Sequence, residues 1–236
     1  MVALTVTGII AGLILLDVVA SNIYGKYIFS GSKASRERNK GRTPVFLVKE
    51  FTGVSVSRGM FHHRGHTWAH WRPDGQVLVG ADDLLHRIIG RIDEIRCPAT
   101  GSSISQGEKA VMIRQGERVL YILSPVTGVV SSINHSIESD PGALRESPYE
   151  RGWIFEVTPT RAVEDIRSLM LSETAEEWIV REERRIRRFI ERRLRTAEWD
   201  LPGGLPDDIN GILEHLGEET WILFKDQFIY QQEWRT

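Results

Sequence analysis

The stretch from Lys109 to Gly128 constrains the fold more than any other part of the chain. Two runs rich in β-branched and aromatic residues, Ala110–Arg114 and Arg118–Leu123, flank a polar tip at residues 115–117. Alternating strands about a short Gly-containing tip predict a β-hairpin. The turn Ser124-Pro125-Val126-Thr127-Gly128 then leads into a further strand. We therefore expect a β-rich domain organised around an exposed hairpin.

The hairpin and its S-P-V-T-G turn resemble the segment by which the H-protein of the glycine cleavage system presents a lipoylated lysine. Further motifs are similar in the same order: His66-Thr67-Trp68 to H-E-W, the V-G-A-D-D-L segment at 79–84 to V-G-I-T-D, and Gly152-Trp153 to G-W. The resemblance covers roughly residues 60 to 158. It implies a lipoyl/biotinyl-like barrel-sandwich hybrid domain.

The residue that would carry the lipoyl group is missing from this resemblance. In the family the lysine falls seven residues before the Ser of the turn, and that position is Glu117 here. The neighbouring residues, Gly116 and Arg118, offer no nucleophilic amine either, because a guanidinium stays protonated. Lys109 lies at the entrance of the strand rather than at the tip. We expect a degenerate lipoyl position and no cofactor.

The first 25 residues predict a transmembrane helix, because the segment at 2–23 is apolar and long enough to cross a bilayer. Its one ionisable residue is Asp17, which either faces a partner helix or lies near the membrane interface. Tyr24 and Tyr27 follow at the level expected for interfacial aromatic residues.

Residues 26–44 predict a flexible basic tether that can contact anionic lipid. Because basic residues follow the apolar segment rather than precede it, we expect a single-pass protein of the inner (cytoplasmic) membrane with its folded domain on the cytoplasmic side. A cleaved signal peptide ending near Ala20 is the alternative.

The central region offers two clusters that could suggest chemistry. His62, His66 and His70 are spaced four apart, but Gly65 and the β-rich surroundings argue against a helix that would converge them on a metal. Asp82 fits an N-cap of a helix that Gly90 ends, rather than half of a catalytic pair. With no nucleophile triad or phosphate loop, we predict that the chain is not an enzyme.

Beyond residue 161 the chain predicts helices, the first at 162–171 and the longest running from a capping box at Thr174 to about Glu198. One face of this helix is apolar and the other is rich in arginine. The arginine face is either a docking surface for acidic protein or lipid head groups, or a solvated face supported by Glu–Arg pairs. Shorter helices are expected at 207–216 and 219–232.

The predicted fold class is α+β, in four parts: a transmembrane helix (1–25), a basic tether (26–44), an H-protein-like lipoyl-type β domain (45–160) and a helical C-terminal extension (161–236). The net charge of -2 gives no reason to expect nucleic acid binding.

Two main functions follow from these features. A third interpretation is a metal sensor built on His62, His66 and His70. The first is a non-catalytic scaffold or accessory subunit of an integral membrane complex, of redox or photosynthetic type for example. The second is a lipoyl-type carrier of one-carbon or glycine metabolism with a displaced attachment site. The residues predicted to contact a protein partner are Arg114, Gln115, Glu117, Arg118, Arg181, Arg184, Arg188 and Arg192.

Overall fold

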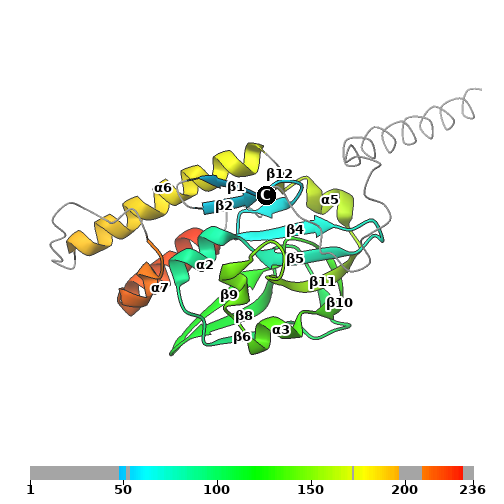
Figure 1. Cartoon of the computed structure of the whole chain (residues 1–236), viewed down its shortest axis with the longest axis horizontal. Coiled ribbons are helices and arrows are strands. Elements are labelled where there is room, and N and C mark those ends of the chain that lie inside the picture. The colour runs from blue at the N-terminus through cyan, green and yellow to red at the C-terminus, as the bar shows by residue number, and fades with distance from the viewer. Residues whose placement is uncertain (1–47, 52–53, 172, 197–208, 231–236) are drawn as a thin grey trace, which may run out of the picture. The chain divides into compact units, whose positions relative to one another are not determined.

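Three antiparallel sheets and a set of helices make up residues 48–51, 54–171, 173–196 and 209–230, the part of the chain that the computed structural model describes (Figure 1). The strands of the largest sheet follow the order β12-β3-β4-β5-β11-β10-β7, and a smaller sheet has the order β6-β8-β9. The third sheet pairs β1 with β2. This sheet-rich architecture with added helices confirms the predicted α+β class for the described residues.

The strands have the following bounds: β1 Val48–Phe51, β2 Val54–Ser57, β3 Phe61–His63, β4 Thr67–Trp71, β5 Val77–Ala81, β6 Glu94–Arg96, β7 Ser103–Ile104, β8 Lys109–Gln115, β9 Arg118–Leu123, β10 Gly128–Ile133, β11 Trp153–Pro159 and β12 Met170–Leu171. The helices are α2 Asp83–Ile89, α3 His135–Ser139, α4 Ala143–Glu146, α5 Ala162–Ile166, α6 Glu173–Thr196, the 3₁₀-helix η1 Ile212–His215, α7 Glu218–Phe224 and the π-helix η2 Lys225–Ile229. The predicted hairpin is therefore present as β8 and β9.

The H-T-W and V-G motifs meet at the centre of the large sheet. Trp68 on β4 lies opposite Gly80 on β5, and its indole nitrogen donates to the carbonyl of Ala81 at 3.0 Å. A Cβ on Gly80 would come within 2.3 Å of the Trp68 ring. The glycine is thus required by close packing against the Trp68 ring, and both motifs serve the fold.

Asp82 joins this sheet to the first helix. Its carboxylate accepts a hydrogen bond from the backbone N–H of Leu85 at 2.9 Å, which confirms the predicted N-cap of α2. The other carboxylate oxygen lies 2.8 Å from Nδ1 of His66, in a pair that is fully buried. Gly90, at φ 82°, ends the helix as expected.

Helix α6 packs its apolar face on the domain, as its periodicity predicts. Its buried apolar residues are Ala175, Trp178, Ile179, Ile186, Phe189, Ile190 and Leu194. Glu182 and Glu183, which interrupt this pattern, are also buried. Each is paired with an arginine of the same helix, at 3.2 Å to Arg185 and 3.0 Å to Arg187, so the buried charges are compensated.

Several boundaries differ from those predicted. The helix expected at 162–171 ends at Ile166, because Met170 and Leu171 form β12 and pair with β3. Helix α6 already contains Thr174, so that residue is not its N-cap. The two short C-terminal helices are instead a 3₁₀ turn followed by an α-helix that continues as a π-helix.

Four histidines are buried among the described residues: His62, His63, His66 and His86. Burial lowers the pKa of His62, and it lowers the pKa of His63 and of His86 to about 4. Burial would also lower the pKa of His66, but the adjacent Asp82 carboxylate outweighs it and raises that pKa. No group of three or more His, Cys, Asp or Glu side chains within the described ranges is arranged to hold a metal ion.

The free energy of unfolding should therefore fall as pH is lowered from about 6.5 to 4. In this window the unfolded chain takes up protons at His63 and His86 that the folded chain rejects, costing about 1.4 kcal/mol per pKa unit for each group. The contribution of His66, whose pKa is raised, has the opposite sign and is lost as pH rises through its folded pKa. Urea unfolding between pH 7.5 and 4 measures the slope.

The variant His86→Gln is the control, because it removes one of the histidines whose pKa burial lowers, whatever it does to absolute stability. It should have a shallower dependence of the unfolding free energy on pH than the parent chain. Identical slopes for the two proteins would contradict the assignment.

Candidate functional site

Hydrogen bonds to neighbouring segments fix the tip of the β8–β9 hairpin, while its outermost side chain is exposed. Gly116, at φ 57°, makes the turn, and its N–H donates to the Asp93 carboxylate at 2.7 Å. The amide of Gln115 points inward and donates to the carbonyls of Ile89 (2.8 Å) and Arg91 (2.6 Å). The tip is thus preorganised by hydrogen bonds between side chains and the backbone that do not involve the residue at position 117.

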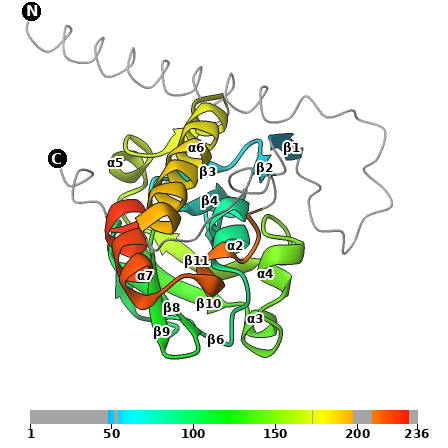
Figure 2. The ribbon, with the colours of Figure 1, turned by 90° about the vertical axis from the view of Figure 1, so that its left-hand side faces the viewer.

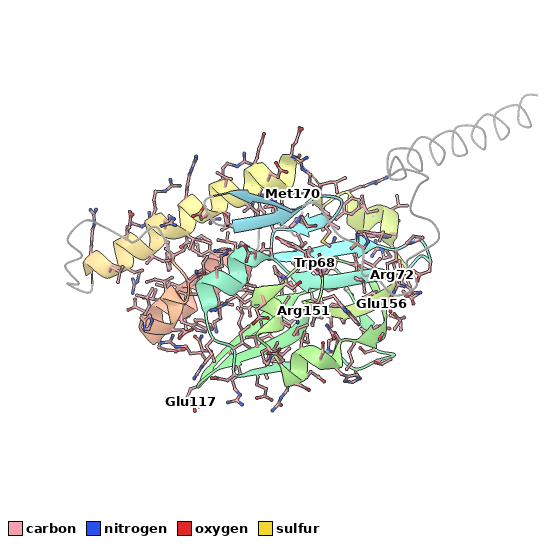
Figure 3. The ribbon with its side chains drawn as sticks, viewed as in Figure 1. Trp68, Arg72, Glu117, Arg151, Glu156 and Met170 are labelled. Atoms are coloured by element: carbon pink, nitrogen blue, oxygen red, sulfur yellow. The ribbon has the colours of Figure 1, made fainter. Side chains whose placement is uncertain are left out.

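Glu117 is the residue that this framework presents to solvent (Figure 3). A lipoyl group is attached as an amide of a lysine amine, so a carboxylate cannot hold it. The tip therefore has the position expected of a lipoyl attachment site but not the required chemistry.

The other predicted contact residues of the hairpin are engaged within the chain. Arg114 pairs with Glu94, and hydrogen bonds from Arg96 and Arg114 lower the pKa of the Glu94 carboxyl. Gln115 is buried. Arg114 is also exposed but is held in its ion pair, whereas Glu117 projects outward at the tip.

Arg118 fastens the C-terminal extension to the hairpin. Its guanidinium donates to the carbonyl oxygens of Leu213 (2.7 Å) and Leu216, at the end of η1. It also lies 3.3 Å from the Glu218 carboxylate and 5.5 Å from the centre of the Trp221 ring. These contacts use the fork of donors that a lysine would lack.

The outer edge of β9 is covered by side chains of η2 and the residue after it. Lys225 Nζ donates to the Val119 carbonyl at 3.0 Å, and the Tyr121 N–H donates to the Tyr230 hydroxyl at 2.7 Å. Burial raises the pKa of Tyr230 to about 12, so the hydroxyl is neutral at physiological pH. Edge strands expose unpaired backbone groups, and these two contacts satisfy a pair of them.

Lys109 lies at the far end of β8 from the tip. Its side chain is exposed, and Nζ is 5.4 Å from the ring centre of Tyr121 and 4.9 Å from that of Tyr230. The amine therefore rests on two aromatic faces in a cation–π arrangement.

Helix α6, which carries the predicted arginine face, lies at the top of Figures 1 and 2, whereas β8 and β9 lie at the bottom. Arg181, Arg184, Arg188 and Arg192 are all exposed there. Of the predicted supporting pairs, Glu177–Arg181 forms at 3.3 Å and Glu183–Arg187 at 3.0 Å. The hairpin and α6 are thus two separate candidate surfaces.

Lys225 and Tyr230 are absent from the sequence-based site because they lie more than 100 residues from β9 along the chain. Without a local pattern linking them to the hairpin, only the packing of the extension reveals them.

The sequence comparisons agree with this geometry. The family described as glycine cleavage H-protein matches residues 60–182, more than half of the chain. The chain belongs to the glycine cleavage H-protein family. The probable glycine cleavage system H protein of Thermococcus kodakarensis is 32% identical over 124 residues, covering 52% of this chain and 92% of the relative. That of Teredinibacter turnerae is 37% identical over 95 residues, covering 40% and 73%.

A glycine cleavage system H protein from Mycobacterium marinum is a match among solved structures. It has a TM-score of 0.46 and 23% sequence identity, and the match covers 54% of this chain and 99% of that protein.

Membership of the H-protein family confirms the resemblance but corrects the predicted location. The relatives are glycine cleavage H-proteins, so the prediction of an inner (cytoplasmic) membrane protein is wrong by this comparison. Among the residues that the structure describes, no helix is long and apolar enough to cross a bilayer. The predicted span with Asp17, Tyr24 and Tyr27, and the tether at 26–44, lie outside the described residues.

Other predictions stay untested. The comparisons lend no support to the scaffold in a membrane complex. The four domain boundaries, the partner subunits, the contact with anionic lipid and the lack of nucleic acid binding all stay predictions.

Replacing Tyr230 by Phe should loosen the edge of β9 locally. The variant keeps the ring beneath Lys109 but removes the acceptor for the Tyr121 N–H. Loss of one hydrogen bond of about 1 kcal/mol should speed hydrogen exchange of the Tyr121 amide roughly fivefold. Exchange measured by NMR should leave the amide of Ile122, on the paired side of β9, unchanged. Equal acceleration at both amides would indicate global destabilisation instead.

Proposed function

We propose that this chain is a non-catalytic carrier of the H-protein type in glycine or one-carbon metabolism, with its attachment site displaced from the hairpin tip to Lys109. The supporting observation is a lipoyl-type hairpin, retained in shape, within a domain that belongs to the H-protein family. Family membership favours this carrier over the membrane scaffold predicted from the sequence.

The choice of Lys109 follows from the chemistry of attachment. A lipoyl carrier needs a primary amine that a modifying enzyme can reach. Lys109 and Lys225 are the lysines whose side chains the structure describes. Lys225 is committed to the Val119 carbonyl, whereas the amine of Lys109 is exposed above two tyrosine rings. An acyl group on Lys109 would extend from the same sheet as the family's attachment lysine, about 20 Å from the tip along the strand.

The native protein should therefore carry a dithiolane-bearing acyl group on Lys109, detected by intact-mass measurement and peptide mapping. Lys109→Arg should abolish the adduct, because a guanidinium keeps the charge but is not acylated. Lys225→Arg is the matched control and should retain it. Native protein of unmodified mass, from cells whose other lipoyl proteins are modified, would exclude the carrier role.

A second candidate function is a docking module that has kept the H-protein shape and given up the acyl arm. The observation that favours it is the exposed carboxylate of Glu117 on an otherwise preserved tip. In this role the chain would be recognised by proteins that bind H-proteins, and the tip would take part through its shape.

The docking candidate predicts that only the side chain at position 117 prevents modification of the tip. Glu117→Lys, treated with a lipoate-attaching enzyme, should be acylated at the introduced lysine, since Gly116, Gln115 and Asp93 fix the turn independently. Glu108→Lys, an exposed change of the same charge at the far end of β8, should react at least tenfold more slowly. If neither introduced lysine is acylated, the tip has lost more than its lysine.

A further inference from the structure

A hollow of about 390 Å³ beside α6 has an unusual concentration of positive charge. Its lining consists of Arg64, Trp178, Arg181, Glu182, Arg184, Arg185 and Arg188. The four arginines of α6 recur at the spacing of one helix face, and Arg64 reaches the hollow from the turn between β3 and β4. The site is therefore formed jointly by the H-protein-like sheet and the C-terminal extension.

The carboxylates around the hollow neutralise only part of this charge. Glu182 pairs with Arg185 at 3.2 Å, and Glu177 pairs with Arg181 at 3.3 Å. Within the described part of the chain, Arg64, Arg184 and Arg188 have no carboxylate within 4.0 Å. Three unpaired guanidiniums around one hollow repel one another, and an anion bound between them would relieve that repulsion.

The walls of the hollow are fixed by buried contacts. Arg185 donates to the Gln227 carbonyl at 3.3 Å and lies 4.9 Å from the centre of the Phe228 ring. In the turn that carries Arg64, His66 has a left-handed backbone (φ 60°), which is uncommon for a residue with a side chain. It is held there by the Asp82 carboxylate, and by its carbonyl accepting from the Asp82 N–H at 3.0 Å.

This constrained turn determines where Arg64 lies. The N–H of Gly65 donates to Nδ1 of His63 at 3.0 Å, and the N–H of His66 donates to the His63 carbonyl at 3.1 Å. The His66 ring in turn lies 5.1 Å from the ring of Trp178 on α6. Arg64 is thus carried on a turn whose conformation is set by buried hydrogen bonds. It lines the hollow together with the arginines of α6.

We propose that this hollow binds a small phosphate-bearing anion. Guanidinium groups offer paired donors that match phosphate oxygens, and the volume is in the range of small-molecule sites. Trp178 supplies an apolar wall for the part of the ligand that carries the phosphate. An acidic peptide is the less suitable ligand, because the unpaired arginines converge on one hollow instead of following an extended track. The site is independent of acyl attachment at Lys109.

Isothermal titration of the full-length chain with inorganic pyrophosphate at low salt tests the proposal. We expect saturable binding of one anion per chain, weakened at least tenfold in Arg184→Gln/Arg188→Gln. The matched control is Arg167→Gln/Arg195→Gln, which removes the same charge from exposed arginines outside the hollow and should change affinity less than twofold. Circular dichroism checks that both double variants are folded. Lys109→Arg should bind like the parent, which separates this test from that of the carrier role.

Two results would overturn the proposal. Equal weakening in both double variants would mean that pyrophosphate responds to net charge and not to the hollow. Binding of a poly-glutamate peptide without binding of pyrophosphate would identify the arginine face of α6 as a surface for acidic protein.

Discussion

The carboxylate of Asp82 is the contact on which both candidate surfaces depend. It caps α2 through the Leu85 N–H and holds His66 in its left-handed conformation, so it orients a helix and a turn at once. Helix α2 ends at Ile89, whose carbonyl accepts a hydrogen bond from the Gln115 amide next to the hairpin tip. From the turn, Arg64 reaches the hollow beside α6. Because the pair is fully buried, each partner also offsets part of the cost of desolvating the other.

The hairpin tip shows how an exposed residue can change without altering the fold that presents it. The turn is specified by Gly116, by the inward amide of Gln115 and by the Asp93 carboxylate. Glu117 is exposed and contributes nothing to these contacts. Substitutions at such positions typically change stability by less than about 0.5 kcal/mol, so folding places almost no constraint on this residue. Shape and chemistry at the tip are therefore free to diverge, which is why the fold alone does not decide whether an arm is carried.

Local patterns in the sequence account for the elements that depend on local forces. The alternation in β8 and β9, the Asp82 cap and the apolar stripe of α6 were all readable, because strand pairing, capping and amphipathic packing follow from residues close in sequence. The strand at Met170 cannot be predicted from local patterns, because its partner on β3 is over 100 residues away. The same holds for the Lys225 contact with β9 and for Arg64 in the hollow. Those features arise from how the extension packs on the sheet.

The packing of α6 determines which of its arginines are paired with a buried carboxylate and which are not. Glu182 and Glu183 are buried, and each neutralises an arginine that packing draws toward the domain. These inner pairs allow a strongly charged helix to cover an apolar sheet without leaving an uncompensated buried ion. Arg184 and Arg188, which form no ion pair within the described part of the chain, line the hollow, where Arg64 joins them from a different element. A face that served only solubility would distribute its charge along the helix. Convergence from two elements onto one volume is what a ligand of opposite charge requires.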